Sequence, residues 1–272
     1  MKKIVLKLGG SILTKKFVES FPLKIEEIRK DASFYIRSHN IRQLIPQITS
    51  ALKQTKLTIV LGVGPFGHYL VQNIKKLEKI ETVHESVYCL SSIVVNSFRN
   101  SGLNVELFDP FETCSYIGDN SFDLDGLWEM IQNSLKGGNI PVTYGDIVSA
   151  SGTKGKYGNY EILSGDRQCL EFAMKWKADK IIMVMDEDGL YDKYPKLHED
   201  AKLIRIVRPN QKLNIIDEGI GADATGRIKS KMEILQIAAK NGITGQLING
   251  LKKDCLKNAL MSDEIIGTLV LT

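Results

Sequence analysis

The chain has little cysteine, no long apolar run and no clustered charge. Its four cysteines lie far apart in 272 residues and form no Cys-x-x-Cys pair (Cys89, Cys114, Cys169 and Cys255). This spacing argues against a zinc site and a disulfide framework, and it indicates a reducing compartment. No apolar run approaches the roughly 20 residues needed to span a bilayer. The first residues read as a strand rather than as a secretion signal, so we expect a cytoplasmic protein with no membrane partner.

The net charge of the chain is small. The 36 basic and 32 acidic residues give +4, and the basic residues are scattered along the sequence. This argues against a nucleic-acid partner and is compatible with anionic small molecules. The sequence also has no internal repeat, no G-x-x-x-x-G-K-[ST] loop, no complete dinucleotide-binding turn, no nucleophile elbow and no clustered His/Cys set. A P-loop enzyme, a dinucleotide enzyme and a nucleophilic hydrolase are therefore disfavoured.

The sequence does have an apolar strand that runs into two glycines at residues 2–11. Gly9 and Gly10 carry no Cβ, so backbone N–H groups there can converge on an anion. Lys7 adds a positive charge just before the turn, and Ser11 adds a hydroxyl. These residues together predict a phosphate-binding turn. The alternative is an ordinary glycine-rich turn after a core strand, with Lys7 as a polar residue at a strand edge.

A second strand, expected at 57–61, runs into another glycine-rich turn at 62–68. The apolar spacing predicts a helix over 41–52, with Pro46 near its first turns. Strands and helices then alternate, and residues 149–160 read as an exposed hairpin tip. Helices are expected at 84–101, 124–135, 166–177 and after residue 223, and strands at 104–108, 139–144, 180–185, 245–250 and 267–271. This alternation predicts an α/β sandwich whose ligands bind beyond the carboxyl ends of parallel strands.

Separated lysines and carboxylates accompany the two glycine turns. This combination suits phosphoryl transfer, in which the protein mainly holds two anionic reactants in line and neutralises the moving charge. Taken singly, each residue has a simpler interpretation: Asp166 could cap the helix that follows it, and His68 could be structural. The candidate residues are Lys7, Lys16, His68, Asp166, Asp186, Asp188 and Lys231.

Five ordered segments of the chain resemble the amino acid kinase family over nearly its whole length. They are residues 7–11, 186–195, 223–231, 249–250 and 267–268. Within that family, the turn at 66–68 is similar to that of isopentenyl phosphate kinases and the related fosfomycin kinases. Residues 144–148 and 163–166 also resemble isopentenyl phosphate kinases. The resemblance implies a three-layer αβα sandwich around a mostly parallel central sheet.

The resemblance also implies a function and a division of the chain. It implies ATP- and Mg²⁺-dependent phosphorylation of a small phosphate monoester, most simply isopentenyl phosphate, giving a diphosphate. Residues 1–163 would bind the acceptor and form a homodimer, and residues 164–272 would bind the nucleotide. No protein-held metal site is implied, because Mg²⁺ would bridge ATP oxygens. The implied roles are catalysis for Lys7, Lys16, His68 and Asp166; nucleotide binding for Lys7, Gly9, Gly10, Ser11, Asp186, Tyr191, Gly226 and Lys231; and acceptor binding for Val63, Gly64, His68 and Gly165.

The sequence departs from the family pattern on both sides of this site. The departures are Leu61, Val63, Pro65, Arg167, Met185, Glu187 and Arg227. Val63 gives up the close backbone approach that glycine permits, and Pro65 removes an N–H donor. Arg167 could meet an extra anionic group of a different acceptor or could lie in solvent. The alternatives to an isopentenyl phosphate kinase are a kinase for a phosphonate or another small metabolite, and a storage protein that binds nucleotides or anions without catalysis.

Overall fold

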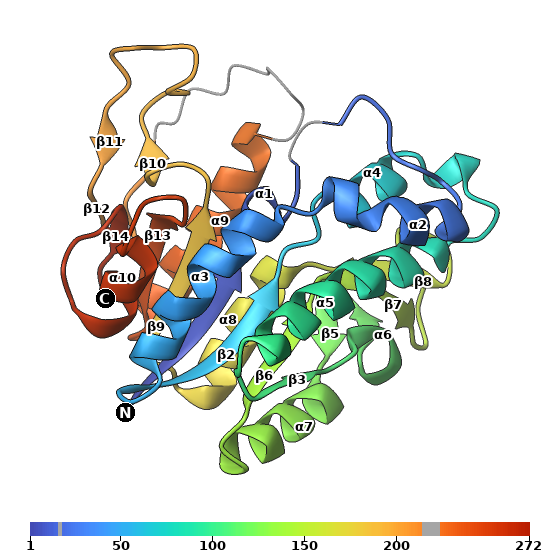
Figure 1. Cartoon of the computed structure of the whole chain (residues 1–272), viewed down its shortest axis with the longest axis horizontal. Helices are drawn as coiled ribbons and strands as arrows, with labels where there is room; N and C mark the ends of the chain where they lie inside the picture. The colour runs from blue at the N-terminus through green and yellow to red at the C-terminus, as the bar shows by residue number, and fades with distance from the viewer. Residues whose placement is uncertain (16–17, 214–223) are drawn as a thin grey trace.

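The computed structural model describes residues 1–15, 18–213 and 224–272, and for residues 224–227 it describes the backbone alone (Figure 1). An eight-stranded sheet runs through the middle of the molecule. Its strands follow the order β12 (Ile206–Val207), β14 (Thr268–Val270), β13 (Thr244–Asn249), β9 (Lys180–Met185), β1 (Lys2–Leu8), β2 (Thr55–Leu61), β6 (Ile140–Tyr144) and β3 (Val105–Leu107). Only the β13–β14 pair in this sheet is antiparallel. The mostly parallel sheet confirms the predicted fold class.

Helices cover both faces of this sheet (Figure 1). One face is covered by α3 (Ser38–Ala51), α5 (Thr82–Asn100) and α10 (Cys255–Met261), with α1 (Gly10–Leu13), α2 (Ile25–Tyr35) and α4 (Pro65–Gln72) at its upper edge. The opposite face is covered by α7 (Asp125–Lys136), α8 (Gly165–Trp176) and α9 (Ala224–Lys240). This is the expected three-layer αβα arrangement.

The alternation of side chains along β1 explains how the sheet divides its two cores. Ile4, Leu6 and Leu8 point into the core under α3 and α5. Val5 points into the core under α8, and Lys7 shares that side because strand side chains alternate. β1 lies between β2 and β9, with Lys7 opposite Val60 and Met183. The sequence therefore brings one lysine to the middle of the sheet, on the α8 side.

Two smaller sheets flank the main one. One of them consists of β4 (Ser115–Gly118), β5 (Ser121–Asp123), β7 (Asp146–Ala150) and β8 (Tyr160–Leu163). The other consists of β10 (Leu190–Tyr191) and β11 (Leu203–Ile204). The short helices α6 (Pro110–Thr113) and η1 (Ile74–Lys76) complete the structure. β7 and β8 pair antiparallel, with Asp146 opposite Leu163, which confirms the hairpin expected at 149–160.

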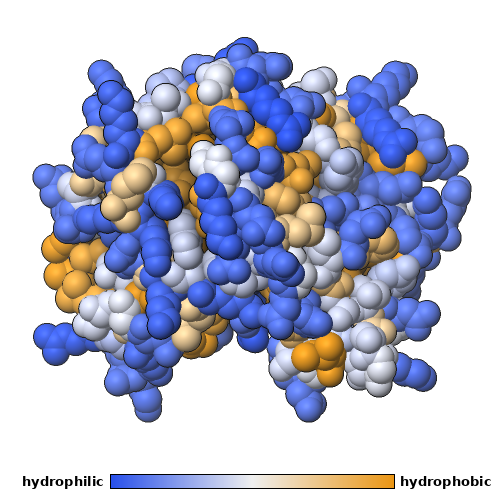
Figure 2. All heavy atoms as spheres, turned by 90° about the horizontal axis from the view of Figure 1, so that it is seen from below, coloured by the Kyte–Doolittle hydropathy of each residue, from blue (hydrophilic) through white to orange (hydrophobic). Residues whose placement is uncertain are grey.

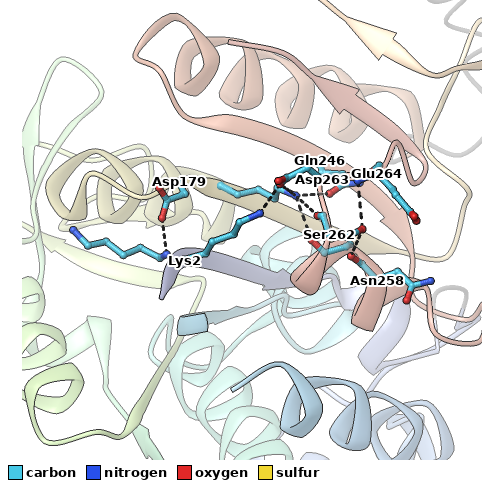
Figure 3. A network of polar contacts seen from close by, with 10 residues as sticks. Lys2, Asp179, Gln246, Asn258, Ser262, Asp263 and Glu264 are labelled. Atoms are coloured by element: carbon cyan, nitrogen blue, oxygen red, sulfur yellow. Dashed lines mark hydrogen bonds and ion pairs between the residues drawn. The ribbon is translucent and has the colours of Figure 1, made fainter. Parts of the chain in front are cut away.

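A buried lysine at the start of β9 fixes the end of α10. Lys180 is 5% exposed, and its Nζ donates to the carbonyl oxygens of Ala259 and Ser262 at 3.3 and 3.2 Å. Figure 3 shows Ser262 beside Asp263. Burial lowers the pKa of Lys180, and Asp263, 3.9 Å away, opposes this shift. Asp263 also pairs with Lys2 at 2.6 Å. This lysine is thus explained by its structural role, because it satisfies carbonyl groups at a helix end.

The face of the molecule seen in Figure 2 is mostly hydrophilic, and its apolar residues form separate patches. The exposed large apolar side chains come from unrelated parts of the chain, such as Phe34 in α2 and Ile117 in β4. Isolated residues of this kind are ordinary on a globular protein. No helix in the described part of the chain is both long and apolar enough to cross a membrane.

Candidate active site

A cavity of about 190 Å³ opens where β1, β2, β6 and β9 end. This is the edge at which parallel α/β sheets bind ligands. Most of its lining comes from residues within six segments of the chain: 7–11, 61–68, 145–147, 162–166, 185–186 and 228–231. Segments 249–250 and 267–268, which the sequence also singled out, do not line it. The remaining lining residues are Val71 in α4 and Val83 and Val87 in α5.

The two glycine turns pack directly against each other at the mouth of this cavity. The Gly62 amide donates to the Leu8 carbonyl at 2.7 Å, and the Gly9 amide donates to the Val184 carbonyl at 2.9 Å. A Cβ on Gly10 would lie 2.5 Å from the Gly64 nitrogen, and one on Gly62 would lie 2.9 Å from the Gly9 carbonyl carbon. Only glycine leaves room for this approach, so the turns form one backbone platform.

Asp166 holds two lysines that come from distant parts of the chain. Its Oδ1 lies 2.7 Å from the Nζ of Lys7, and its Oδ2 lies 3.0 Å from the Nζ of Lys231. The side chains of Lys7, Asp166 and Lys231 are 8%, 13% and 16% exposed. Asp166 does not cap α8, because the Ser164 hydroxyl performs that role by accepting from the Arg167 amide at 3.1 Å.

The charges of this trio are set by mutual neutralisation. Burial alone would raise the pKa of Asp166, but Lys7 and Lys231 hold it well below the usual carboxyl range. Asp166 therefore carries a negative charge at neutral pH and fixes where both ammonium groups point. Two ammonium groups beside a backbone platform form a site for phosphate oxygens.

One side of the cavity is mostly apolar, with His68 and Asp146 as polar residues among its lining. His68 lies in the first turn of α4, which begins at Pro65 after Gly64, a residue with φ of 51°. Its side chain lines the cavity beside Val63. Behind them lie the apolar side chains of Val71, Val83, Val87, Ile147, Ile162 and Leu163. On this side, the His68 imidazole can donate a hydrogen bond to a phosphate oxygen. The apolar side chains behind it form a pocket for a small hydrocarbon.

The other side of the cavity is formed by the second half of the chain. Met185 and Asp186 at the end of β9, with Ile228 and Lys231 of α9, line it. Asp188, further along the same loop, turns away to Lys252 at 2.6 Å and to the Asn249 amide at 2.9 Å. Burial would raise the pKa of Asp188, but the hydrogen bonds from Lys252 and Asn249 hold it below its usual value.

Most of the predicted site residues share this one cavity. Ten of them line it: Lys7, Gly9, Gly10, Ser11, Val63, His68, Gly165, Asp166, Asp186 and Lys231. Gly64 and Tyr191 do not line it: Gly64 supports the turn at Gly10, and Tyr191 lies in β10. Lys16 lies outside the described residues, and Gly226 falls in the first turn of α9, where only the backbone is described.

Several departures from the family pattern have structural explanations. Arg167 pairs with Glu171 one turn along α8 at 2.7 Å, and it does not line the cavity. Glu187 pairs with Lys196 at 2.6 Å. Pro65 occupies the first position of α4, where its missing N–H costs no helical hydrogen bond. The side chain of Arg227 is not described.

Val63 and Leu61 are accommodated by their neighbours. A Cβ on Gly67 would lie 2.5 Å from Val63 Cγ2, so the valine fills the space that this glycine leaves. Leu61 is fully buried and lines the cavity. Both side chains therefore add apolar surface to the cavity without disturbing the turns.

Sequence reasoning missed several lining residues. Val83 and Val87 lie on the buried face of α5, and Ile147 and Ile162 come from the β7–β8 hairpin. The helical spacing of α5 marked its buried face, but spacing alone does not tell a core contact from a cavity wall. For Ile228, which also lines the cavity, the sequence predicted only a helix after residue 223.

The match to a family model now identifies the class of protein. The model of the amino acid kinase family matches residues 2–249, and the chain belongs to this family. Its sequence is 26% identical to the isopentenyl phosphate kinase of Methanothermobacter thermautotrophicus over 98% of each chain. It is 27% identical to the isopentenyl phosphate kinase of Methanocaldococcus jannaschii, over 97% of this chain and 96% of that one.

A solved structure agrees with this fold. A crystal structure of an isopentenyl phosphate kinase substrate complex superposes with a TM-score of 0.75 at 23% identity. The match covers 99% of this chain and all of that one. At this identity the likeness concerns the fold alone.

Proposed function

We propose that this protein is an ATP-dependent kinase that transfers a phosphoryl group to a small phosphate monoester. Isopentenyl phosphate is the acceptor that fits best, and isopentenyl diphosphate and ADP are then the products. The observation that carries this proposal is the Lys7–Asp166–Lys231 trio, which lies in a cavity with a glycine platform and an apolar acceptor side. The full-length relatives named as isopentenyl phosphate kinases support the same acceptor.

The geometry explains how such a transfer proceeds. The γ-phosphoryl group moves between two anionic oxygens, and its charge must be neutralised in line. Lys7 and Lys231, fixed by one carboxylate, supply positive charge from two sides of that path. The Gly9 N–H already donates to the Val184 carbonyl, so we assign the hold on the nucleotide phosphates to the Gly10 N–H and to the close approach that both glycines allow. The protein itself forms no covalent bond.

The two ends of the cavity differ in the ligand that they suit. His68 lies in the first turn of a helix, where an imidazole and backbone N–H groups both suit an acceptor phosphate. The valines and isoleucines behind it suit a short branched hydrocarbon. Met185, Asp186 and Ile228 then belong to the nucleotide side. The same division supports an acceptor-binding unit at 1–163 and a nucleotide-binding unit at 164–272.

Magnesium fits this site as an ion carried by the nucleotide. Asp166 is already committed to two ammonium groups, so an ion held chiefly by ATP oxygens, beside Asp186, is the simplest arrangement. Such an ion would neutralise charge on the transferred group. We further propose that the protein works as a homodimer in the cytoplasm, as its family resemblance implies.

The proposal is tested by release of ADP from Mg-ATP in the presence of a panel of acceptors. The panel contains isopentenyl phosphate, other small phosphate monoesters, and phosphonates such as fosfomycin. We expect turnover above the no-acceptor background with isopentenyl phosphate and formation of its diphosphate. Turnover with a phosphonate alone would assign that acceptor instead. Nucleotide binding without any turnover across the panel would indicate a binding or storage protein.

Replacement of His68 separates the two substrate sites. In His68→Ala we expect the KM for the acceptor to rise about tenfold or more, because a hydrogen-bond donor to its phosphate is lost. The KM for ATP should stay within about twofold. His39→Ala, on the exposed surface of α3, is the matched control. Equal KM values for the acceptor in His68→Ala and wild type would remove His68 from the acceptor site.

A further inference from the structure

His84 joins two walls of the acceptor side of the cavity. It lies in the first turn of α5, between Val83 and Val87, which both line the cavity. Its side chain is 17% exposed and reaches β7, whose residues Asp146 and Ile147 also line the cavity. A contact between His84 and β7 therefore sets how closely these two walls approach each other.

Each ring nitrogen of His84 faces a carboxylate. Nδ1 lies 2.7 Å from Oδ2 of Asp146, whose side chain is completely buried. Nε2 lies 3.8 Å from Oδ2 of Asp109, the N-cap residue of α6. Only the imidazolium form has an N–H on both nitrogens. The ring also stacks on Phe111, with centroids 4.1 Å apart and planes 17° apart.

The charged groups around the ring favour the imidazolium form. Burial opposes the charge on His84, but Asp146, Asp109 and Glu85 together raise its pKa above the usual value. Burial raises the pKa of Asp146 to about 6, against the effect of the hydrogen bond from His84. Glu85 is itself paired with Lys79 at 3.2 Å.

Tyrosines complete the surroundings of the ring. Burial, with Asp146 and Asp109 adding to it, raises the pKa of Tyr144 on β6. The Tyr88 ring centroid is 6.0 Å from that of His84. On the outer side, the Tyr160 hydroxyl of β8 donates to Glu81 at 2.7 Å, just before α5. The raised pKa values of Tyr144 and Tyr160 keep these two phenols neutral at physiological pH, so the carboxylates are the groups that set the charge of the ring.

We propose that His84 is a positioning residue that holds α5 against β7 through Asp146, and against the start of α6 through Asp109, and so fixes the width of the acceptor pocket. His84 need not touch the acceptor, because Val83 and Val87 form the wall on its own helix. The kinetic part of this inference rests on the proposed function, whereas its titration and stability parts do not.

The direction of the pH dependence follows from the raised pKa of His84. The stabilising contribution of the imidazolium is fully present below the unfolded pKa of histidine, about 6.5. It is lost as the pH rises through the higher folded-state value. The raised pKa of Asp146 acts in a separate window, because its burial costs stability as the pH rises from about 3.9 to about 6. Above that window Asp146 is charged and pairs with the imidazolium. The hold on α5 therefore weakens toward alkaline pH.

His84→Asn is the direct test in the full-length protein. Asparagine keeps a donor near the Nδ1 position but neither titrates nor reaches Asp109. We expect the KM for the acceptor to rise about tenfold, with kcat and the KM for ATP within about twofold, because a pocket wall has moved. His39→Asn makes the same change on the surface and should match the wild type.

The pH profile gives a readout that a general structural role would not move. Ionisation of the acceptor phosphate changes the KM for the acceptor with pH in the wild type, His84→Asn and His39→Asn alike. In the wild type and in His39→Asn, this KM should show a further rise toward alkaline pH. His84→Asn should lack the extra rise. Asp109→Asn, which still caps α6, should shift that rise to lower pH because one carboxylate no longer stabilises the imidazolium.

Unfolding and NMR titration keep the test independent of the reaction. The loss of thermal stability in His84→Asn should be larger at pH 6 than at pH 8. In the wild type, the NMR signals of the His84 imidazole should titrate with a pKa above the usual value for histidine. An unchanged KM for the acceptor in an active protein would overturn the inference, and so would a stability loss independent of pH. Stabilisation by Zn²⁺ that requires His84 would overturn it in favour of a metal site. A wild type inactive on every acceptor would instead refute the proposed function.

Discussion

Asp166→Asn is expected to lower kcat about a thousandfold. The amide cannot balance the ammonium groups of Lys7 and Lys231, which the carboxylate holds at 2.7 and 3.0 Å. The two lysines would then repel each other and lose their common orientation beside the transferred group. Because the reaction depends on pre-positioned charge, this loss affects the chemical step more than the binding of either substrate. Initial rates over a range of ATP and acceptor concentrations measure the effect.

The stability of Asp166→Asn checks the same ion pairs by a second route. The folded-state pKa of Asp166 lies below its unfolded value, so these pairs stabilise the wild type above the ordinary carboxyl pKa of about 3.9. That contribution is lost as the pH falls through the folded-state pKa. We expect the gap in melting temperature between wild type and variant to be large at pH 7 and to shrink in acid. Glu171→Gln, an acid-to-amide change on the same helix, is the control. Activity of Asp166→Asn within tenfold of the wild type would contradict the role given to Asp166.

The sequence predicted the arrangement of strands better than the contacts between helices. The apolar run of β1 and the glycines after it located the platform, because strand alternation and the lack of a Cβ are local properties. The Asp166–Lys231 contact joins residues 65 positions apart and depends on how α8 and α9 lie together. The family resemblance implied a catalytic role for Asp166, but its pairing with Lys231 required the structure.

Two other features show where local reasoning fails. The structure begins α3 at Ser38, before the first apolar residue of the pattern, so Pro46 lies inside the helix rather than near its first turns. Pro46 is exposed there, and Arg42, whose carbonyl loses its helical donor, is an exposed residue as well. His84 went unnoticed because its partners, Asp109 and Asp146, lie in α6 and β7. Such pairs become visible only when the elements are packed.

Gly62→Ala should disable both substrate sites, although residue 62 carries no chemical group. A Cβ there would lie 2.9 Å from the carbonyl carbon of Gly9 and would press against the Gly10 nitrogen, which is backbone that cannot rotate away. The two glycine turns must then separate, and the hydrogen bond from the Gly62 amide to the Leu8 carbonyl weakens. A shift of about 1 Å in a phosphate-binding platform costs roughly a hundredfold in rate. We therefore expect kcat/KM to fall by about that factor for the acceptor and for ATP alike.

The cost to folding should be smaller than the cost to activity. Overpacking of this kind usually destabilises a protein by about 1–3 kcal/mol, which leaves a domain of this size folded. Circular dichroism and a urea titration would establish this before the kinetics are compared. Gly126→Ala is the matched control, because Gly126 is an exposed residue in α7 whose Cβ would meet only the Thr113 carbonyl, at 3.5 Å. Alanine should be neutral or slightly stabilising there. Gly62→Ala and Gly126→Ala could both keep wild-type kinetics. That result would show that the contact between the two turns does not position the phosphates.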